Sequence, residues 1–408
     1  MIRTPAVDSA RMQADLDALA EFREPDTEGW TRRVFSPAYT RSREWVASSM
    51  GDAGLAVKRD GAGNVVGALP GSSSGLLVTG SHTDTVAGGG RFDGPLGVLA
   101  AIEVARCIRD SGYALQHELR VVDFLGEEPN EFGVSCVGSR SIAGTLTPTH
   151  LASRDASGRT LAEAIASAGG DPDRISDAAW TPGSMSAFVE LHIEQGPVLE
   201  DSGIPLAIVS GIAGIDRVQA IFSGEAAHAG TTPMDSRHDA LCAAAEAVLA
   251  VERLASGGVG TTGRLEVFPG AANVVPGKAE MWAEFRSIDR AWLDERHEGF
   301  ARAAAEAGAR RGVVTKVSAM SRTEPVTTSA EVRAAMKIAI EGLGLQFLVL
   351  ASGAGHDTVQ MARLGPVGMI FVPSAGGRSH CADEWTGPEY VEAGASALLA
   401  TILALDAR

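Results

Sequence analysis

Two buried-strand segments with a helix between them constrain the fold of this chain more than any other feature. GLLVTG (75–80) and LRVVDFLG (119–126) are apolar runs of strand length, and GVLAAIEVARCIRD (97–110) has its apolar residues at helical spacing. A strand, a helix and a second strand in this order form a βαβ unit, whose strands pair in a mostly parallel sheet. The sequence therefore predicts an α/β domain.

The pattern changes after residue 213. At 408 residues the chain exceeds the size at which one core usually stops growing, so two domains are expected. The later segment has strand patterns at 215–225, 263–270, 279–288 and 313–320, one helix that starts near Pro233 and another at 292–312. This βαββαβ order predicts a compact α+β module, at 214–328, inserted into a catalytic domain formed by 1–213 and 329–408. Segments 347–350 and 367–374 are expected to be buried strands of that domain.

Charge and cysteine content exclude several classes of function. The formal net charge of -16 disfavours nucleic acid and anionic membranes as partners, because both attract basic surfaces. The four cysteines are scattered and form no C-x-x-C pair, so neither a disulfide framework nor a zinc knuckle is indicated. The sequence has no secretory h-region and no apolar run near the ~20 residues needed to span a bilayer. We therefore expect a cytoplasmic enzyme whose cationic groups or metal ions bind any anionic substrate.

The first candidate site segment is SHTDTVAGGGRFDG (81–94), directly after a predicted strand. It places His82 and Asp84 at the carboxyl end of the strand, where open α/β sheets carry their sites, and Asp93 in a glycine-rich loop. The alternative is an ordinary polar loop in which Asp93 caps the helix that begins near Pro95.

The second segment is FLGEEPNEF (124–132), which follows the other strand of the βαβ unit. Adjacent side chains of an extended backbone point in opposite directions, so one of Glu127 and Glu128 can bind a metal while the other faces water. The alternative is a solvated acidic loop.

Two further segments each contribute a histidine. In ELHIEQGPVLE (190–200), Glu190, His192 and Glu194 share one strand face, and in GGRSHCADE (376–384) His380 follows a buried strand. Singly, these are compatible with a hydrogen-bonded sheet histidine and a loop histidine. Together the four segments supply nitrogen and oxygen ligands suited to Zn²⁺, Mn²⁺ or a similar ion. The candidate ligands are His82, Asp93, Glu128, His192 and His380.

These segments resemble the M20-type co-catalytic metallohydrolases, in particular the branch of N-carbamoyl-L-amino acid hydrolases, allantoate amidohydrolases and β-ureidopropionases. The resemblance covers most of the chain and rests on segments in the family's order. They are GSHTDTVAGGGRFDG, FLGEE, GSRSIAG, ELHIEQGPVLE, HAGTTPMDSRHDAL, ANVVPG with EFRSID, SGAGHD, and MIFVPSAGGRSHCADEWT. One departure is Pro129 and Asn130, where many relatives carry a Gly/Ser-Arg-Phe run, which puts the accepted substrate size in question.

The resemblance implies two divalent ions per subunit, Zn²⁺ foremost, with Mn²⁺, Co²⁺ or Ni²⁺ as other candidates. It implies that His82, Asp93 and His192 hold one ion, that Asp93, Glu128 and His380 hold the other, and that Asp93 bridges. Asp84 would orient His82, and Glu127 would act as the general base. The implied substrate contacts are His228, Asn273 and Arg286 in the inserted module, with Gln195 and His356 in the catalytic domain. The module would also form a homodimer, in which His228 serves its own site or that of the partner subunit.

The predicted reaction is hydrolysis of the carbamoyl C–N bond of an N-carbamoyl amino acid or a related ureido acid, a small carboxylate substrate. Glu127 would carry the proton of the attacking water to the leaving nitrogen, and His228 would donate to the tetrahedral oxyanion. An N-acyl amino acid deacylase or a metallopeptidase is the alternative enzyme, because it shares the metal chemistry. A non-catalytic metal-dependent binding protein is the alternative of another class.

Arg286 illustrates how the same residue supports two interpretations. It lies in the alternating strand segment AEMWAEFRSI, on the face that also carries Trp282 and Glu284. One interpretation is a surface ion pair, worth about 0–1 kcal/mol. The other is that its guanidinium binds the substrate α-carboxylate through two parallel hydrogen bonds, a geometry that lysine lacks.

Overall fold

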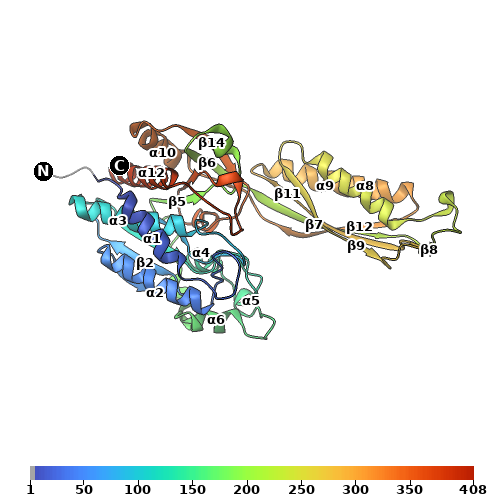
Figure 1. Ribbon diagram of the computed structural model, residues 1–408, viewed down its shortest axis with the longest axis horizontal. Coiled ribbons are helices and arrows are strands. Elements are labelled where there is room, and N and C mark those ends of the chain that lie inside the picture. The colour runs from blue at the N-terminus through green and yellow to red at the C-terminus, as the bar shows by residue number, and fades with distance from the viewer. Residues whose placement is uncertain (1–4) are drawn as a thin grey trace. The chain divides into compact units, whose positions relative to one another are not determined.

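The computed structural model describes residues 5–408, which divide into two compact units. The first unit contains the chain up to Ser210 together with Thr328–Arg408, and the second contains Gly211–Thr327. Figure 1 labels many of their helices and strands. The division places nearly all of the βαββαβ segment in the second unit.

The large sheet has nine strands in the order β1-β2-β4-β3-β5-β15-β6-β13, with β14 also paired to β6. The strands are β1 (Ala56–Arg59), β2 (Val65–Leu69), β3 (Leu76–His82), β4 (Glu118–Phe124), β5 (Ala187–Ile193), β6 (Leu206–Ile212), β13 (Val326–Thr327), β14 (Phe347–Ser352) and β15 (Val367–Val372). The four central strands, β4, β3, β5 and β15, are parallel, and antiparallel pairs flank them. The predicted fold class, α/β with a mostly parallel sheet, is confirmed, and the parallel strands bring their carboxyl ends to one edge.

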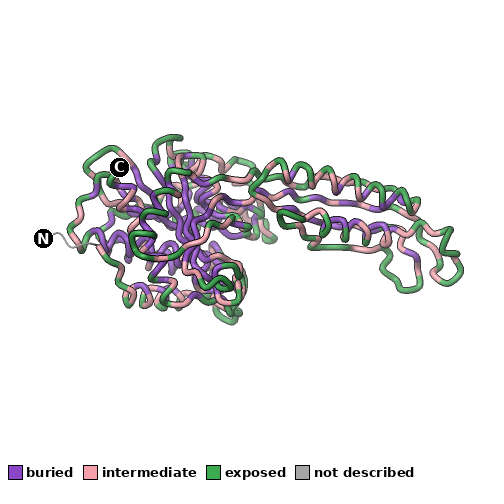
Figure 2. Tube along the Cα trace, turned by 90° about the horizontal axis from the view of Figure 1, so that it is seen from above, coloured by how far each residue is buried: buried purple, intermediate pink, exposed green. Residues whose placement is uncertain are grey.

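Apolar helices cover this sheet and form the main core. Helix α3 (Pro95–Ser111) packs on β3, β4 and β5, and α12 (Pro388–Asp406) packs on β5, β15 and α3. Every residue of α3 from Pro95 to Ile108 is buried, which explains its apolar sequence. Figure 2 shows the buried residues concentrated in the interior of this unit. The other helices of the unit are α1 (Ser9–Ala20), α2 (Pro37–Asp52), α4 (Val137–Ile142), α5 (Pro148–Leu151), α6 (Leu161–Ser167), η1 (Pro172–Ala178), α7 (Val198–Ser202), α10 (Ala330–Gly342), α11 (Thr358–Met361) and η3 (Ala375–Gly377).

One of the predicted buried strands is not buried. Segment 347–350 forms part of β14, but its side chains are partly or fully exposed, and Val349 is 61% exposed. The strand pairs with β6 outside the main path of the sheet, and Val349 and Ala351, which share one of its faces, are exposed. An apolar run of this length does not by itself distinguish a central strand from such a position.

The second unit is a four-stranded antiparallel sheet, ordered β12-β7-β11-β9, with helices α8 and α9 packed on it (Figure 1). Its elements are β7 (Gly214–Ser223), β8 (Ala227–His228), η2 (Met234–Ser236), α8 (Ala240–Leu254), β9 (Val259–Phe268), β10 (Val274–Val275), β11 (Lys278–Ser287), α9 (Arg290–Arg310) and β12 (Val314–Arg322). Alternate residues of β11 from Ala279 to Phe285 point into a core shared with both helices. The predicted order βαββαβ is present, with the short pair β8–β10 added.

The first helix of this unit starts later than predicted. The sequence favoured a start near Pro233, but α8 begins at Ala240, and only a short 3₁₀ turn lies between them. The carboxylate of Asp239 accepts the backbone N–H of Cys242 at 3.0 Å and so caps the helix. The capping residue, rather than the proline, determines the first helical turn.

Among residues 5–408, no helix is both long enough and apolar enough to cross a bilayer.

Candidate metal centre and active site

The first half of the site lies at the carboxyl ends of β3 and β5. His82 is the last residue of β3, His192 is next to the last residue of β5, and Asp93 lies in the loop before α3. Asp93 Oδ1 is 3.1 Å from His192 Nε2 and 3.7 Å from His82 Nε2, and all three residues are buried. The structure therefore brings together three residues that are up to 110 positions apart in the sequence.

The loop before α3 depends on a glycine beside His82. Gly94 has φ 82°, in the left-handed region, and a Cβ at this position would lie 2.4 Å from Cε1 of His82. Gly94 is also the N-cap of α3, where no side chain makes a capping hydrogen bond. The alternative that Asp93 serves as a helix cap is therefore wrong.

Backbone carbonyls set the orientation of both buried imidazoles. His82 Nδ1 lies 3.0 Å from the carbonyl oxygen of Asp84, and His192 Nδ1 lies 2.9 Å from that of Ile193. A carbonyl only accepts, so each Nδ1 carries the proton and each Nε2 presents its lone pair. His192 Nε2 is buried and has no hydrogen-bond partner among the described residues. A lone pair directed at a carboxylate oxygen 3.1 Å away fits a cation held between them.

The second half of the site shares Asp93. His380 Nε2 lies 3.2 Å from Asp93 Oδ2 and 3.3 Å from Glu128 Oε1. Asp93 thus directs one oxygen at each half. Within each set of three residues, the possible ligand atoms lie within 4.8 Å of one another, and the donor types suit a divalent transition metal.

Glu127 lies between His82 of this centre and the buried thiol of Cys136. Its Oε2 is 3.8 Å from His82 Nε2, and the thiol of Cys136 donates to its Oε1 at 3.5 Å. Glu127 and Glu128 are both buried, so the alternative of a solvated acidic loop is wrong. The two side chains face different histidines, Glu127 facing His82 and Glu128 facing His380.

The resemblance implied that Asp84 orients His82, but the Asp84 carboxylate has other partners in the structure. Its carboxylate accepts the backbone N–H groups of Glu127 and Glu128, each at 3.2 Å, whereas its distance to His82 Nδ1 is 3.6 Å. The hydrogen bond to His82 comes from the Asp84 carbonyl instead. Asp84 therefore holds the two glutamates in place with its side chain and orients His82 with its backbone.

The electrostatics of the centre follow from buried carboxylates facing imidazoles. Burial alone would raise the pKa of Asp93, but His192, His380 and His82 hold it well below its usual value. Burial raises the pKa of Glu127 well above its usual value, because desolvation outweighs the attraction of His82. Asp93 and Glu128 raise the pKa of His380 to about 11. Clustered carboxylates of this kind are stabilised by a divalent cation.

His356 and Gln195 border the same centre. The ring of His356 packs edge-on against His192 with centroids 4.6 Å apart, and its Nε2 is 2.9 Å from Ser352 Oγ. Gln195 donates to Asp93 Oδ2 at 2.6 Å. Gln195 and His380 both have positive φ, at 58° and 56°, a strained conformation for residues other than glycine that clusters at functional sites.

A third set of potential ligands, Glu190, His192 and His356, has a structural explanation. One oxygen of Glu190 accepts from Ser81 Oγ, and the other accepts from the backbone N–H and hydroxyl of Thr358. Both oxygens are therefore engaged in hydrogen bonds that tie β5 to its neighbours.

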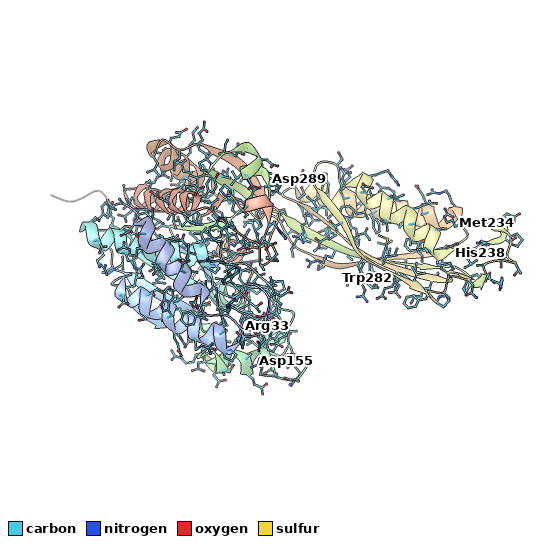
Figure 3. All side chains as sticks on the ribbon, in the orientation of Figure 1. Arg33, Asp155, Met234, His238, Trp282 and Asp289 are labelled. Carbon is cyan, nitrogen blue, oxygen red and sulfur yellow. The ribbon has the colours of Figure 1, made fainter. Side chains whose placement is uncertain are left out.

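A cavity of about 500 Å³ borders this edge within the first unit, a volume typical of small-molecule sites. Its wall includes Asp84, Glu128 and the segments 33–37 and 129–131. Arg33, labelled in Figure 3, is held by Glu24 through two hydrogen bonds of 3.0 and 2.6 Å. The departure from the family pattern at Pro129 and Asn130 thus lies in the wall of this cavity.

Sequence reasoning missed Glu384, which is buried against the loop that carries Asp93. Its Oε1 accepts the backbone N–H groups of Phe92 and Asp93 at 2.8 and 3.0 Å. Burial raises the pKa of Glu384 to about 7. The sequence does contain one indication of it, because Glu384 lies four positions after the candidate ligand His380, in the segment GGRSHCADE (376–384).

The remaining predicted contacts lie in the second unit. His228, in β8, pairs with Val274 next to Asn273, and the Ala229 N–H donates to the carbonyl of Asn273 at 3.0 Å. Arg286, in β11, donates from Nε to Glu284 Oε1 at 2.7 Å. The structure thus brings His228 and Asn273 together. Arg286 forms an ion pair, with Glu284, as one of its two interpretations predicted.

With this geometry in place, comparison with known proteins identifies the family. Residues 78–404 match the peptidase family M20/M25/M40. The chain belongs to this family. Its members are metal-dependent, and the clusters around Asp93 supply residues suited to that dependence.

Several relatives align with this chain over most of their own length. An N-carbamoyl-L-amino acid amidohydrolase from Geobacillus stearothermophilus is 41% identical over 401 residues, 97% of this chain and 98% of the relative. A ureidoglycolate hydrolase from Oryza sativa subsp. japonica is 36% identical over 404 residues, 96% of this chain and 84% of the relative. The solved structure of an amidase of the hydantoinase/carbamoylase family from Burkholderia multivorans has a TM-score of 0.93 and 32% identity, covering 100% of both chains. This M20 chain is a hydrolase that acts on C–N bonds, as the sequence predicted.

Proposed function

We propose that this protein is a binuclear-metal amidohydrolase that cleaves the ureido C–N bond of N-carbamoyl amino acids or related ureido acids such as allantoate. The single observation that carries the proposal is the geometry of Asp93, whose two oxygens face two separate histidine-containing half-sites at 3.1 and 3.2 Å. The names of the relatives, which act on carbamoyl and ureido compounds, support the substrate class.

The residues fit two divalent ions, with Zn²⁺ foremost. His82, Asp93 and His192 would hold one ion, and Asp93, Glu128 and His380 the other. When bound, such ions supply Lewis acidity, which polarises a carbonyl oxygen and makes water ionise near neutral pH. The N–H donors at His82 and His192 are already engaged with carbonyls, so their Nε2 atoms are oriented for this task.

Glu127 would act as the general base. Its raised pKa reflects a poorly solvated carboxylate with high proton affinity, and its Oε2 lies on the side of the centre facing His82. A carboxylate placed there takes a proton from the attacking water and delivers it to the nitrogen of the leaving group, which is worth typically ~10²–10⁴-fold in rate. Asp84, through the backbone N–H groups of Glu127 and Glu128, would fix the direction of both side chains.

His228 would stabilise the oxyanion of the tetrahedral intermediate. Its Nδ1 accepts the backbone N–H groups of Gly230 and Thr231 at 3.1 and 3.2 Å. The neutral ring therefore carries its proton on Nε2 and presents a donor to its surroundings. We propose that the second unit is a lid that brings this donor to the site, and that it also forms a homodimer, as in the family it resembles.

The substrate would be a small carboxylate. Arg286 would bind the α-carboxylate of the substrate, with Asn273, Gln195 and His356 as further contacts. In a protein of net charge -16, such a local cation offsets the repulsion between the protein and an anion.

Ammonia release distinguishes this function from deacylation and peptide hydrolysis. Hydrolysis of an N-carbamoyl amino acid yields the free amino acid, carbon dioxide and ammonia, whereas N-acetyl amino acids and unmodified dipeptides yield no ammonia. Metal-loaded protein should release ammonia from N-carbamoyl amino acids or allantoate, and liberate little amine from N-acetyl amino acids or dipeptides. Preferred cleavage of the latter two classes would overturn the proposal.

A further inference from the structure

The shared carboxylate of Asp93 is useful only if both of its oxygens are held in fixed directions. The backbone just before and at this residue is fixed by Glu384, a side chain 291 positions away in the sequence. Glu384 is buried, with 2% of its surface exposed, and its Oε1 accepts both the Phe92 and Asp93 N–H groups. One carboxylate oxygen therefore clamps two successive peptide units of the loop.

The other oxygen of Glu384 reaches the same ligand through a hydroxyl. Ser379 Oγ lies 3.1 Å from Glu384 Oε2 and 2.7 Å from Asp93 Oδ2. Glu384 therefore binds the backbone of Asp93 directly, and Ser379, with its single hydroxyl proton, lies between the two carboxylates. Since Ser379 directly precedes His380, the same network connects both candidate ligands of the second half-site.

The glycine-rich loop is shaped to admit this carboxylate. A Cβ at Gly90 would lie 2.1 Å from Glu384 Cδ, 2.2 Å from Oε1 and 2.4 Å from Cβ. These are its three nearest neighbours, so the space that a side chain at position 90 would need is filled by Glu384. The absence of a side chain at Gly90 is thus linked to the presence of Glu384.

We propose that Glu384 is the positioning residue of the bridging carboxylate, setting the direction of Asp93 toward both ions at once. The inference rests on the proposed binuclear function. Without the Glu384 carboxylate, two buried N–H groups lose their acceptor, and the loop must shift to satisfy them. Because Asp93 belongs to both half-sites, such a shift would weaken both, whereas loss of a ligand such as His192 or Glu128 affects one directly.

A purely structural role makes a different prediction, and Glu103 supplies the control. Glu103 is also a fully buried glutamate, and it accepts hydrogen bonds from the Asp8 N–H and from Arg11. It also interacts with Cys107 and Arg106 of its own helix, and none of these partners is a candidate metal ligand. Substitution of Glu103 is therefore expected to lower stability while leaving metal binding unchanged.

The test is a Zn²⁺ competition titration with a chromophoric chelator, on folded wild type, Glu384→Ala, Glu384→Gln, Gly90→Ala and Glu103→Gln. We expect Glu384→Ala and Gly90→Ala to weaken Zn²⁺ binding roughly 10–100-fold, the scale for residues that orient metal ligands. Glu384→Gln should retain more affinity, since its carbonyl still accepts the two N–H groups.

The visible absorption of the Co²⁺-loaded proteins gives a second measurement, since it reports ligand geometry independently of turnover. Wild-type Zn²⁺ affinity in Glu384→Ala would overturn the inference, as would equal weakening in Glu103→Gln. If Glu384→Ala does not fold, wild-type affinity in Gly90→Ala overturns it instead. Failure of the proposed function is seen in a different measurement: the wild-type protein would bind two ions but release no ammonia from ureido substrates.

Discussion

The two units hold their predicted site residues in opposite ways. In the first unit His82, Asp93, Glu127, Glu128 and His192 are buried, and of the candidate metal ligands His380 alone is exposed. Backbone carbonyls orient the two buried imidazoles, and the carboxylates of Asp84 and Glu384 accept the backbone N–H groups of the three acidic residues. In the second unit His228 and Asn273 are exposed, and Arg286 is only partly buried. The difference shows that a core holds most of the candidate metal ligands and Glu127 in place, whereas the predicted contacts of the second unit lie at its surface.

The largest effect should come from removing the metal ions, which tests the buried side of this comparison. Chelation should abolish hydrolysis, and Zn²⁺ or Mn²⁺ should restore it, because the carboxylates and imidazoles around Asp93 are arranged for cations. Metal analysis of saturated protein should give two ions per chain. Asp93→Asn should lower the content of both ions, whereas Asp216→Asn, at a buried carboxylate of the second unit paired with Arg290, should leave it unchanged. Saturation at one ion per chain would contradict the binuclear centre.

The next effect separates the two adjacent glutamates. Glu127→Gln should keep both ions and lose roughly 10²–10⁴-fold in kcat, because the amide preserves the shape of the side chain but accepts no proton. Glu128→Gln, its matched control, should instead lower metal occupancy, since Glu128 faces His380 at 3.3 Å. Steady-state kinetics together with metal analysis decide the assignment. Near-normal kcat in Glu127→Gln, or equal metal loss in both variants, would show that the two roles are misassigned.

The smallest effect should come from the exposed side, at Arg286. Arg286→Lys should lose about 1.5–3 kcal/mol in kcat/KM for carboxylate substrates, the scale of a hydrogen bond to a charged group. The loss should shrink greatly for the corresponding substrate amide, which lacks the interaction in both enzymes. Arg217→Lys is the matched control, because Arg217 also pairs with Glu284. An equal loss on acid and amide would remove Arg286 from carboxylate binding.

The sequence predicted the residues that gather around Asp93 because each lies at or after the carboxyl end of a strand of the parallel sheet, and parallel strands end at one edge. It did not predict the contacts that orient them. Glu384 meets Asp93 only after 291 intervening residues have folded, and Asp84 uses its carboxylate on backbone N–H groups rather than on the nearby imidazole. The start of α8 was misplaced for a related reason, since the capping bond of Asp239 outweighed the preference of Pro233 for a first helical turn.

The hydrogen bonds from His82 and His192 to the carbonyls of Asp84 and Ile193 have a consequence for how this enzyme tolerates mutation. A side-chain acceptor is lost with a single codon change, but every amino acid that replaces Asp84 or Ile193 still carries a carbonyl. The tautomer of both imidazoles is therefore encoded by the path of the chain and not by the identity of its neighbours. Genetic drift can alter the exposed surface of the second unit while the tautomers of these two imidazoles are inherited unchanged.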